Sequence, residues 1–236
     1  MTLKTLTPVE ARVLATLMEK ARTVPDSYPL SLNALVLGCN QKTSRNPLMD
    51  ISDDDARAAL QSLKVQSLKV QSLVFEAAAS RVPRFEHNFQ RAALVNEAQA
   101  VALGLLMLRG PQTAAELRLN GDRWYKFADA EAAEAVLQAL QQRGDDGGQA
   151  LVLKLPKMPG AREARWTHLL CGEVDIAALQ AAAVAPQRGE SDSLLARLTA
   201  LETTVASLRA DNRQLHAHLA NISAQLGIAL EDKSPL

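Results

Sequence analysis

Aromatic residues are scarce in this chain. They make up 3% of its 236 residues, whereas hydrophobic residues as a whole reach 47%. That apolar content is ample for a packed core, and Ala and Leu recur throughout it. Cores of this kind are typical of helices packed through aliphatic side chains rather than of a β-sandwich. The composition therefore predicts a folded, mostly helical protein.

The sequence also lacks long apolar runs and paired cysteines. No stretch of 18 apolar residues occurs, and the opening MTLKTLTPVEARV has no uninterrupted apolar core of the signal-peptide type. We therefore expect a cytoplasmic protein that does not enter a membrane. Cys39 and Cys171 belong to no C-x-x-C pair, so neither a disulfide framework nor a zinc ribbon is indicated.

Familiar catalytic and cofactor-binding motifs are missing too. The chain contains no G-x-x-x-x-G-K-[ST], no G-x-G-x-x-G after a predicted strand, no H-E-x-x-H and no G-x-S-x-G. RGDDGGQ (143–149) follows a predicted helix and precedes a strand, which is the wrong order for a phosphate loop. The four histidines are scattered, and the acidic triplet 53–55 fits a helix start better than a Mg²⁺ site. We expect no catalytic residue, no metal site, no cofactor and no enzyme activity.

A net charge is absent as well, although the charge is unevenly distributed. Lys and Arg balance Asp and Glu over the whole chain, but residues 1–92 carry +3, residues 93–172 carry 0 and residues 173–236 carry −3. Nucleic-acid binders often show a strong basic excess, because counterion release from phosphates drives much of their affinity. Any such surface must therefore be local here.

Residues 1–92 contain signals for three helices and a hairpin. Thr7-Pro8-Val9-Glu10 has a capping residue, a proline at the first helical position and an acidic residue three positions after the cap. We predict helices from there to about Arg22, from Ser31 to about Cys39, and from Ser52 onward. LVFEAAASRVPRFEHNF then predicts two short strands around a turn. Three helices followed by a hairpin is the order of a winged helix-turn-helix unit.

The same order recurs in residues 93–175. Helices are predicted in NEAQAVALGLLMLRG, QTAAELRLN and DAEAAEAVLQALQQR, and a second hairpin in ALVLKLPKMPGAREARWTHLL. The predicted fold class is thus mainly α with small β-hairpins (α+β): two tandem winged helix-turn-helix domains, 1–92 and 93–175, followed by a C-terminal coiled-coil helix.

Several motifs carry a resemblance to a known family. EARV (10–13), YPLSLN (28–33) and CNQKT (39–43), together with LRGPQTAAELR and EARWTHLLCGEV in the second half, resemble the signature of the YceH family of uncharacterised bacterial proteins. The likeness covers roughly residues 3–175 and a helical tail. It implies a tandem winged-helix fold and brings no established activity.

After a predicted linker at 176–190, residues 191–228 show the leucine spacing of a coiled coil. Apolar residues recur at alternating intervals of 4 and 3 from Leu194 to Leu226, and Asn212 falls at a core position, where a lone Asn favours a parallel dimer. We expect homodimerisation and a flexible tail at 229–236; a helix that folds back onto its own domains is the alternative. The expected dimer contacts are Leu198, Leu201, Val205, Leu208, Asn212, Leu215, Leu219 and Ile222.

DNA is the nucleic-acid partner that this organisation favours. The third helix of a winged helix normally enters the major groove, while wings and helix ends contact phosphates. The three aspartates of the first unit oppose that use of its third helix, so we expect loop and wing cations to make the contacts. The candidate nucleic-acid-binding residues are Lys42, Arg45, Arg81, Arg84, Lys154, Lys157, Arg162 and Arg165.

Two functions remain open from the sequence. One is a homodimeric DNA-binding transcriptional regulator. The other is a non-catalytic interaction or scaffold module, in which the basic residues are merely solvated surface charges. Trp124, Tyr125 and Trp166 suit core packing better than base stacking.

The pentapeptide SLKVQ occurs twice in succession at 62–71. A period of five matches neither helices nor strands, so we interpret one copy as an insertion near the end of the first unit's third helix. Either that helix continues for about one more turn, or the added copy bulges out before Val74.

Overall fold

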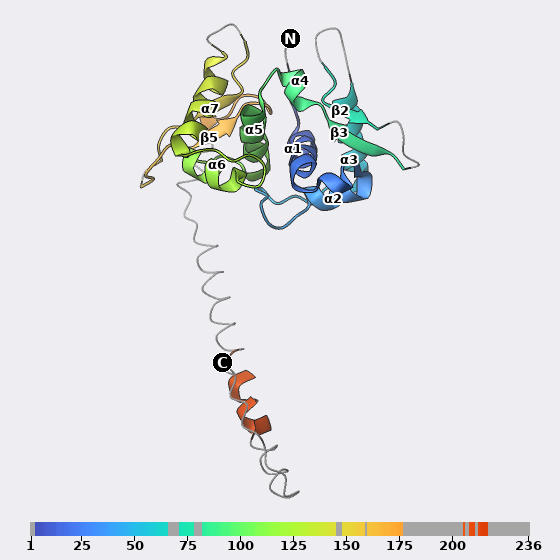
Figure 1. Ribbon diagram of the computed structural model, residues 1–236, viewed down its shortest axis with the longest axis vertical. Helices are drawn as coiled ribbons and strands as arrows, with labels where there is room; N and C mark the ends of the chain where they lie inside the picture. Colours follow the sequence, from blue (N-terminus) through green and yellow to red (C-terminus); the bar gives the residue numbers. More distant parts are fainter. Residues whose placement is uncertain are drawn as a thin grey trace, which may run out of the picture. The chain divides into compact units, whose positions relative to one another are not determined.

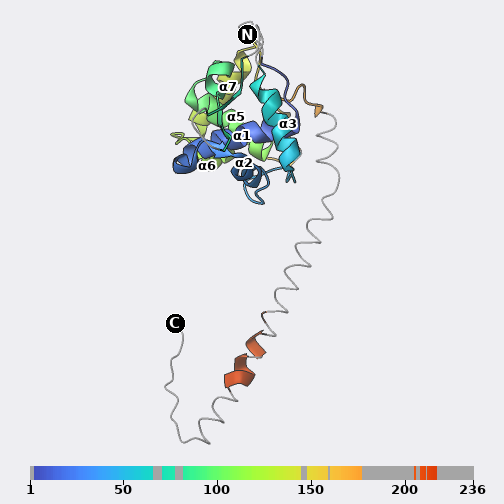
Figure 2. The same cartoon turned by 90° about the vertical axis from the view of Figure 1, so that its right-hand side faces the viewer.

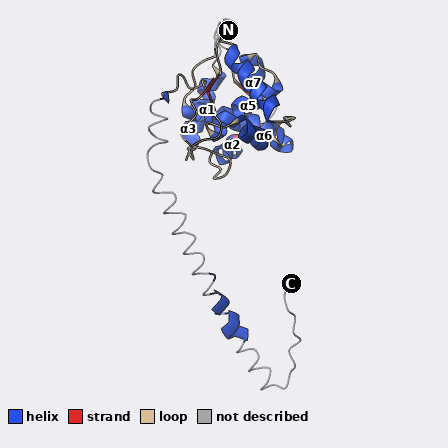
Figure 3. Ribbon diagram, turned by 90° about the vertical axis from the view of Figure 1, so that its left-hand side faces the viewer, coloured by secondary structure: helices blue, strands red, loops and turns tan. Residues whose placement is uncertain are grey.

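A computed structural model describes most of the first 176 residues and part of a C-terminal helix. Its contacts divide the chain into two compact units, Met1–Gln180 and Ala181–Leu236, which we treat separately. Helices dominate the first unit and the strands are short, so the fold is α+β as predicted (Figure 3). The described residues are 3–65, 71–77, 82–144, 148–158, 160–176, 205, 208–210 and 212–216.

Within its described residues, the first half of this unit has five helical segments and a three-stranded antiparallel sheet. Strand β3 is central in the order β1-β3-β2, with Leu30 opposite Phe85 and Val74 opposite His87. The elements are α1 (Pro8–Thr23), the 3-10 helix η1 (Pro25–Ser27), β1 (Leu30–Ser31), α2 (Leu32–Cys39), α3 (Asp53–Lys64), β2 (Val74–Glu76), β3 (Arg84–His87) and α4 (Phe89–Ala93). Helix α4 was not expected from the sequence.

The second half repeats this order with one strand reduced to a single bridge. Its elements are α5 (Glu97–Arg109), α6 (Ala114–Gly121), α7 (Ala130–Gln142), β4 (Val152–Lys154) and β5 (Trp166–His168). Strands β4 and β5 pair antiparallel, and Gln112 pairs with Trp166 just before α6, as β1 pairs with β3 just before α2. The two halves therefore share one topology.

Side-chain caps fix where the helices begin. Thr7 caps α1 and Ser52 caps α3, each with an acidic residue three positions later that returns a hydrogen bond to the cap backbone. These reciprocal bonds satisfy two N–H groups that a helix start leaves without partners. Both caps were predicted from sequence and are confirmed.

Helices α1 and α5 form the centre of the unit. They stand side by side, with α2, α3 and the first sheet on one flank and α6, α7 and β5 on the other (Figures 1 and 2). Every residue of α1 from Glu10 to Glu19 is buried, and so is every residue of α5 from Ala100 to Leu108. Because both helices are enclosed, the two halves share a continuous hydrophobic core. No helix in the described part of the chain is long and apolar enough to span a lipid bilayer.

The C-terminal unit is described only in part. Val205, 208–210 and 212–216 are helical and exposed. Of the expected dimer contacts, Val205, Leu208, Asn212 and Leu215 are thus in a helix, while Leu198, Leu201, Leu219 and Ile222 lie outside the described residues. The coiled coil remains a prediction.

Helix α3 ends inside the first SLKVQ copy. Its last residue is Lys64, and Val65 is already extended, so the described residues do not continue the helix by another turn. The chain returns at Ser72 and Leu73: the Leu73 N–H donates to the Leu63 carbonyl at 2.9 Å, and the Ser72 hydroxyl donates to the Lys64 carbonyl at 3.2 Å. Residues 66–70, which make up most of the repeat between these points, lie outside the described part.

We predict that deleting 66–70 preserves the fold. The deletion restores a single SLKVQ and shortens the segment between Leu63 and Leu73 from nine residues to four. The Leu73 N–H would then donate to a carbonyl five residues earlier, which is the spacing of the hydrogen bond that closes many helix C-termini. The lower loop-closure entropy should stabilise the protein by roughly 0.7 kcal/mol, or about 2 °C in Tm. Thermal unfolding by circular dichroism measures this, and loss of a cooperative transition would contradict it.

Candidate functional site

The loop between α2 and α3 is anchored by a buried ion pair. The Arg45 guanidinium is wholly buried and donates to both Glu19 carboxylate oxygens, at 3.2 and 2.5 Å, and to the Gly38 carbonyl at 2.8 Å. Burial alone would raise the pKa of Glu19, but the hydrogen bonds and charge of Arg45, with help from Lys20, lower it below the usual glutamate value. Glu19 therefore stays ionised and holds Arg45 against α1.

A second buried arginine fastens the same loop from the other side. Arg12 of α1 is 1% exposed and donates to the carbonyls of Cys39, at 3.1 Å, and Pro47, at 2.6 Å. Burial and, secondarily, the charge of Arg45 lower the pKa of Arg12. Asn40 closes the loop, because its side chain exchanges two hydrogen bonds with the backbone of Ile51, at 2.9 and 2.8 Å. The loop is consequently a rigid part of the structure.

One residue of the expected nucleic-acid-binding set, Arg45, is buried and does not belong in that set. We expected it to face a phosphate, but none of its side-chain surface is exposed and its guanidinium is bonded inside the protein. Lys42, three residues earlier in the same loop, is exposed and makes no hydrogen bond or ion pair with the described residues. The loop therefore offers Lys42 to a ligand and retains Arg45 for its own structure.

The other basic candidates separate into paired and free residues. Arg84 donates to the Pro29 carbonyl at 2.8 Å, and Arg165 pairs with Glu116 at 2.6 Å. Lys154 pairs with Glu134 at 2.5 Å and lies over the Trp166 ring. Lys157 and Arg162, at the turn of the second hairpin, are exposed and have no such partner in the described part of the chain. Arg81 lies outside it.

Neither third helix presents an unpaired cation. The exposed face of α3 carries Asp53, Asp54 and Asp55, and Arg57 on that face pairs with the first two of them. Helix α7 contains no Lys or Arg between Ala130 and Gln142. Of the candidate nucleic-acid-binding residues that the structure describes, those without a partner therefore lie in a loop and at a hairpin turn.

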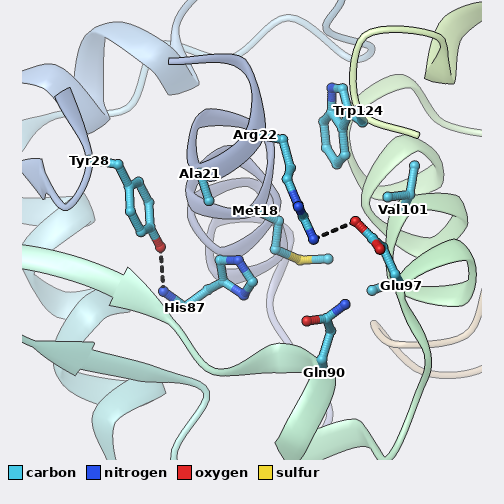
Figure 4. Close-up of a pocket in the computed structure, with 10 residues that line it drawn as sticks. Met18, Ala21, Arg22, Tyr28, His87, Gln90, Glu97, Val101 and Trp124 are labelled. Carbon is cyan, nitrogen blue, oxygen red and sulfur yellow. Dashed lines mark hydrogen bonds and ion pairs between the residues drawn. The ribbon is translucent and has the colours of Figure 1, made fainter. Parts of the chain in front are cut away.

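A cavity of about 280 Å³ opens between α1, the end of β3 and α5 (Figure 4). Tyr28 accepts a hydrogen bond from the His87 backbone N–H at 2.7 Å, Arg22 forms an ion pair with Glu97, and Met18 lies between these two contacts. Burial raises the pKa of Tyr28 to about 12, so this hydroxyl stays protonated. The sequence did not indicate this cavity, because its lining residues come from distant segments with no shared motif.

His87 and His168 occupy equivalent positions at the ends of β3 and β5. In each, Nδ1 is buried without a hydrogen-bond partner among the described residues. Burial lowers the pKa of both to about 4, and Arg22 adds to the effect at His87. Within the same residues, no three His, Cys, Asp or Glu side chains are grouped so as to hold a metal ion.

Comparison with known proteins identifies relatives of nearly the same length. A family model described as "Protein of unknown function, DUF480" matches residues 6–161. A UPF0502 protein of Polaromonas sp. (strain JS666 / ATCC BAA-500) is 71% identical over 98% of this chain and 95% of its own. UPF0502 proteins of Polaromonas naphthalenivorans and Delftia acidovorans are 59% and 54% identical, over 87% and 94% of this chain and 96% and 93% of theirs.

Glu19→Gln should be strongly destabilising. The change leaves the Arg45 charge buried without its counter-ion, and breaking such a pair costs about 3–5 kcal/mol. Glu97→Gln is the matched control, because its partner Arg22 and Glu97 itself are both about half exposed and such pairs contribute under about 1 kcal/mol. Urea unfolding monitored by circular dichroism compares the two variants; similar small losses in both would contradict the role given to Glu19.

Stability should fall as the pH is lowered from 6.5 toward 4. In this window His87 and His168 bind protons in the unfolded chain. In the folded chain their pKa values are about 4, so they stay unprotonated there. Each histidine contributes up to about 3 kcal/mol, fully present above pH 6.5. Urea unfolding of a His87→Gln/His168→Gln variant should show a flatter pH dependence between these limits than the parent, and parallel curves would refute the assignment.

Proposed function

Because the chain belongs to the DUF480 family, described as proteins of unknown function, we propose a function from its own geometry. It is a DNA-binding protein, a homodimeric transcriptional regulator built on two tandem winged helices of the type found in the YceH family, and it acts in the cytoplasm. In this proposal the protein binds DNA and catalyses no reaction.

The repeated topology carries this proposal. Each half places a strand or bridge before its second helix, then a third helix, then an antiparallel hairpin that pairs back with the first strand. We take that arrangement as the framework of a winged helix, a fold much used for DNA binding. Fold alone does not fix function, so the side chains must supply the DNA contacts.

The free cations support binding to the DNA backbone. Lys42, Lys157 and Arg162 are exposed and have no carboxylate partner in the described chain, whereas α3 presents aspartates. Phosphate contacts position a protein on DNA without reading its bases. We therefore assign affinity to the loop and the second hairpin and expect little base readout from the third helices.

The C-terminal helix supplies the dimer in this proposal. Val205, Leu208 and Leu215 fall at core positions of the heptad, and each exposes between 46% and 62% of its surface in the single chain. A second copy of the helix would cover this apolar stripe, and Asn212 would fix its register.

An interaction or scaffold module is the second candidate. The acidic face of α3 and exposed apolar residues such as Leu37, Leu48 and Leu119 favour a protein partner over DNA at those surfaces. Such a module would not bind DNA at low ionic strength.

Binding of the full chain to random duplex DNA tests the proposal. Fluorescence anisotropy should show that the affinity for DNA falls steeply as the salt concentration rises. The Lys157→Gln/Arg162→Gln variant should have a smaller slope of log affinity against log salt concentration, by roughly 1 for each phosphate that it no longer neutralises. Sedimentation in the same buffer should give twice the 25.5 kDa mass of one chain.

Arg91→Gln is the control, because Arg91 is exposed and free of an ion-pair partner among the described residues but lies on α4, outside the proposed contacts. Its salt slope should match that of the parent. Absence of binding at low salt would favour the scaffold function.

A further inference from the structure

A second cavity, of about 440 Å³, lies where the C-terminal ends of α1 and α5 meet the α2–α3 loop and the loop after α6. Four cationic side chains line it: Lys20, Lys42, Arg109 and Arg123. They come from four segments of the chain, so their convergence is a property of the fold and not of a local charge run.

Among the described residues, Glu19 is the one carboxylate that lines this cavity, and it does not balance these cations. Its two oxygens are already bonded by Arg45, and Lys20 lies 3.2 Å from one of them. Lys42 and Arg123 are exposed and make no ion pair with the described residues. The cavity therefore has a surplus of positive charge, and an anion inside it would reduce the mutual repulsion of these side chains.

Neutral hydrogen-bonding groups complete the polar wall. Arg109 donates to the Ser44 hydroxyl at 2.7 Å, and Ser44 has a left-handed backbone (φ 62°) whose carbonyl accepts from Arg45 at 2.9 Å. Thr43 adds a hydroxyl group to the lining, whereas the Thr23 hydroxyl already donates to the Glu19 carbonyl at 3.1 Å. The buried ion pair behind the loop thus fixes the position of a wall that can donate hydrogen bonds to oxygen atoms.

Trp124 forms an aromatic wall of the same cavity. Its ring packs on α5 at Gly104 so closely that a Cβ atom there would lie 2.6 Å from the ring atom Cζ3. Its backbone N–H donates to the Gly121 carbonyl at 2.7 Å. The indole is held in place before any ligand arrives, which lowers the entropic cost of stacking on it.

Helix ends account for only some of these cations. Lys20 and Arg109 lie in the last turns of α1 and α5, where positive charge is favoured by the helix dipole. Lys42 and Arg123 lie in loops, where that explanation does not apply. The helix dipole therefore does not explain why all four cations line one cavity beside an aromatic ring.

We propose that this cavity binds a small phosphorylated molecule of the nucleoside phosphate class. The cations and hydroxyl groups hold the phosphates, and the base stacks on Trp124, an interaction that contributes about 1–3 kcal/mol for a base on an aromatic side chain. The volume is within the range of small-molecule sites. This site goes beyond the proposed DNA binding and is tested without DNA.

Trp124 fluorescence provides a direct measurement on the full chain. Trp166, the other tryptophan, is 1% exposed and supplies a constant background. Titration with ATP should quench Trp124 with a dissociation constant below about 1 mM. Inorganic phosphate should compete with ATP, and adenosine, which has no phosphate, should bind at least about 10-fold more weakly, equivalent to 1.4 kcal/mol.

Lys42→Gln/Arg123→Gln removes the two free cations without breaking an internal bond that the structure shows. We expect at least a 10-fold loss of ATP affinity, about the effect of 1.4 kcal/mol, and an unchanged Tm. Arg91→Gln/Lys126→Gln is the matched control, because it neutralises two exposed, unpaired cations that do not line the cavity. Isothermal titration calorimetry gives the affinities independently of fluorescence.

Three results would overturn the proposal. They are the absence of saturable ATP binding, equal affinity for ATP and adenosine, and an equal loss of affinity in the control and the cavity variant. Retained ATP binding in a chain that fails to bind duplex DNA would support the cavity and refute only the proposed DNA function.

Discussion

The enclosure of α1 is the constraint on which the rest of this structure depends. A helix buried on all sides must pair every charge it carries, because an unpaired charge in a low-dielectric interior costs several kcal/mol. Helix α1 carries Glu10, Arg12 and Glu19 into that interior, and Lys4 pairs with Glu10. Apart from Lys20, which lies 3.2 Å from Glu19, the partners of Arg12 and Glu19 come from one stretch of chain, between Gly38 and Pro47. The need to pair two charges on one helix thus determines the path of the loop that follows α2.

The fixed loop then shapes the surface beside it. Arg45 is drawn inward to Glu19, and the residues next to it turn outward: Ser44 reaches Arg109 of α5, and Lys42 faces solvent. Asn46 also donates its N–H to the Leu108 carbonyl, at 2.8 Å. A loop of the first half is therefore bonded to the last turn of the second half's central helix. The polar cavity arises at this junction, and its two free cations come one from each half.

Local signals made much of the fold predictable, whereas the candidate site depended on contacts between distant residues. The caps at Thr7 and Ser52, the helix lengths and the hairpin ending at Trp166 and His168 follow from neighbouring residues, and the structure contains them. Arg45 has polar neighbours in sequence and was expected to be exposed. Its partner Glu19 lies 26 residues away on α1, and no local pattern in the sequence indicated that this helix is buried on all sides. Lys154 and Arg165 were likewise expected to be free, but Glu134 and Glu116 of α7 and α6 bind them. Pairing across distant elements decides which cations remain available, and a single sequence does not contain that information.

The two halves keep one topology but close it in different ways. In the first, β1 contributes two paired residues beside β3. In the second, Gln112 makes one backbone bridge to Trp166 and adds its side chain, with Nε2 donating to the Leu105 carbonyl at 3.1 Å and Oε1 accepting from Asn120 at 2.8 Å. That side chain joins α5 to α6. Asn120 also lines the polar cavity. The single bridge of the second half is thus supplemented by side-chain bonds of Gln112, one of which holds Asn120 in the cavity wall.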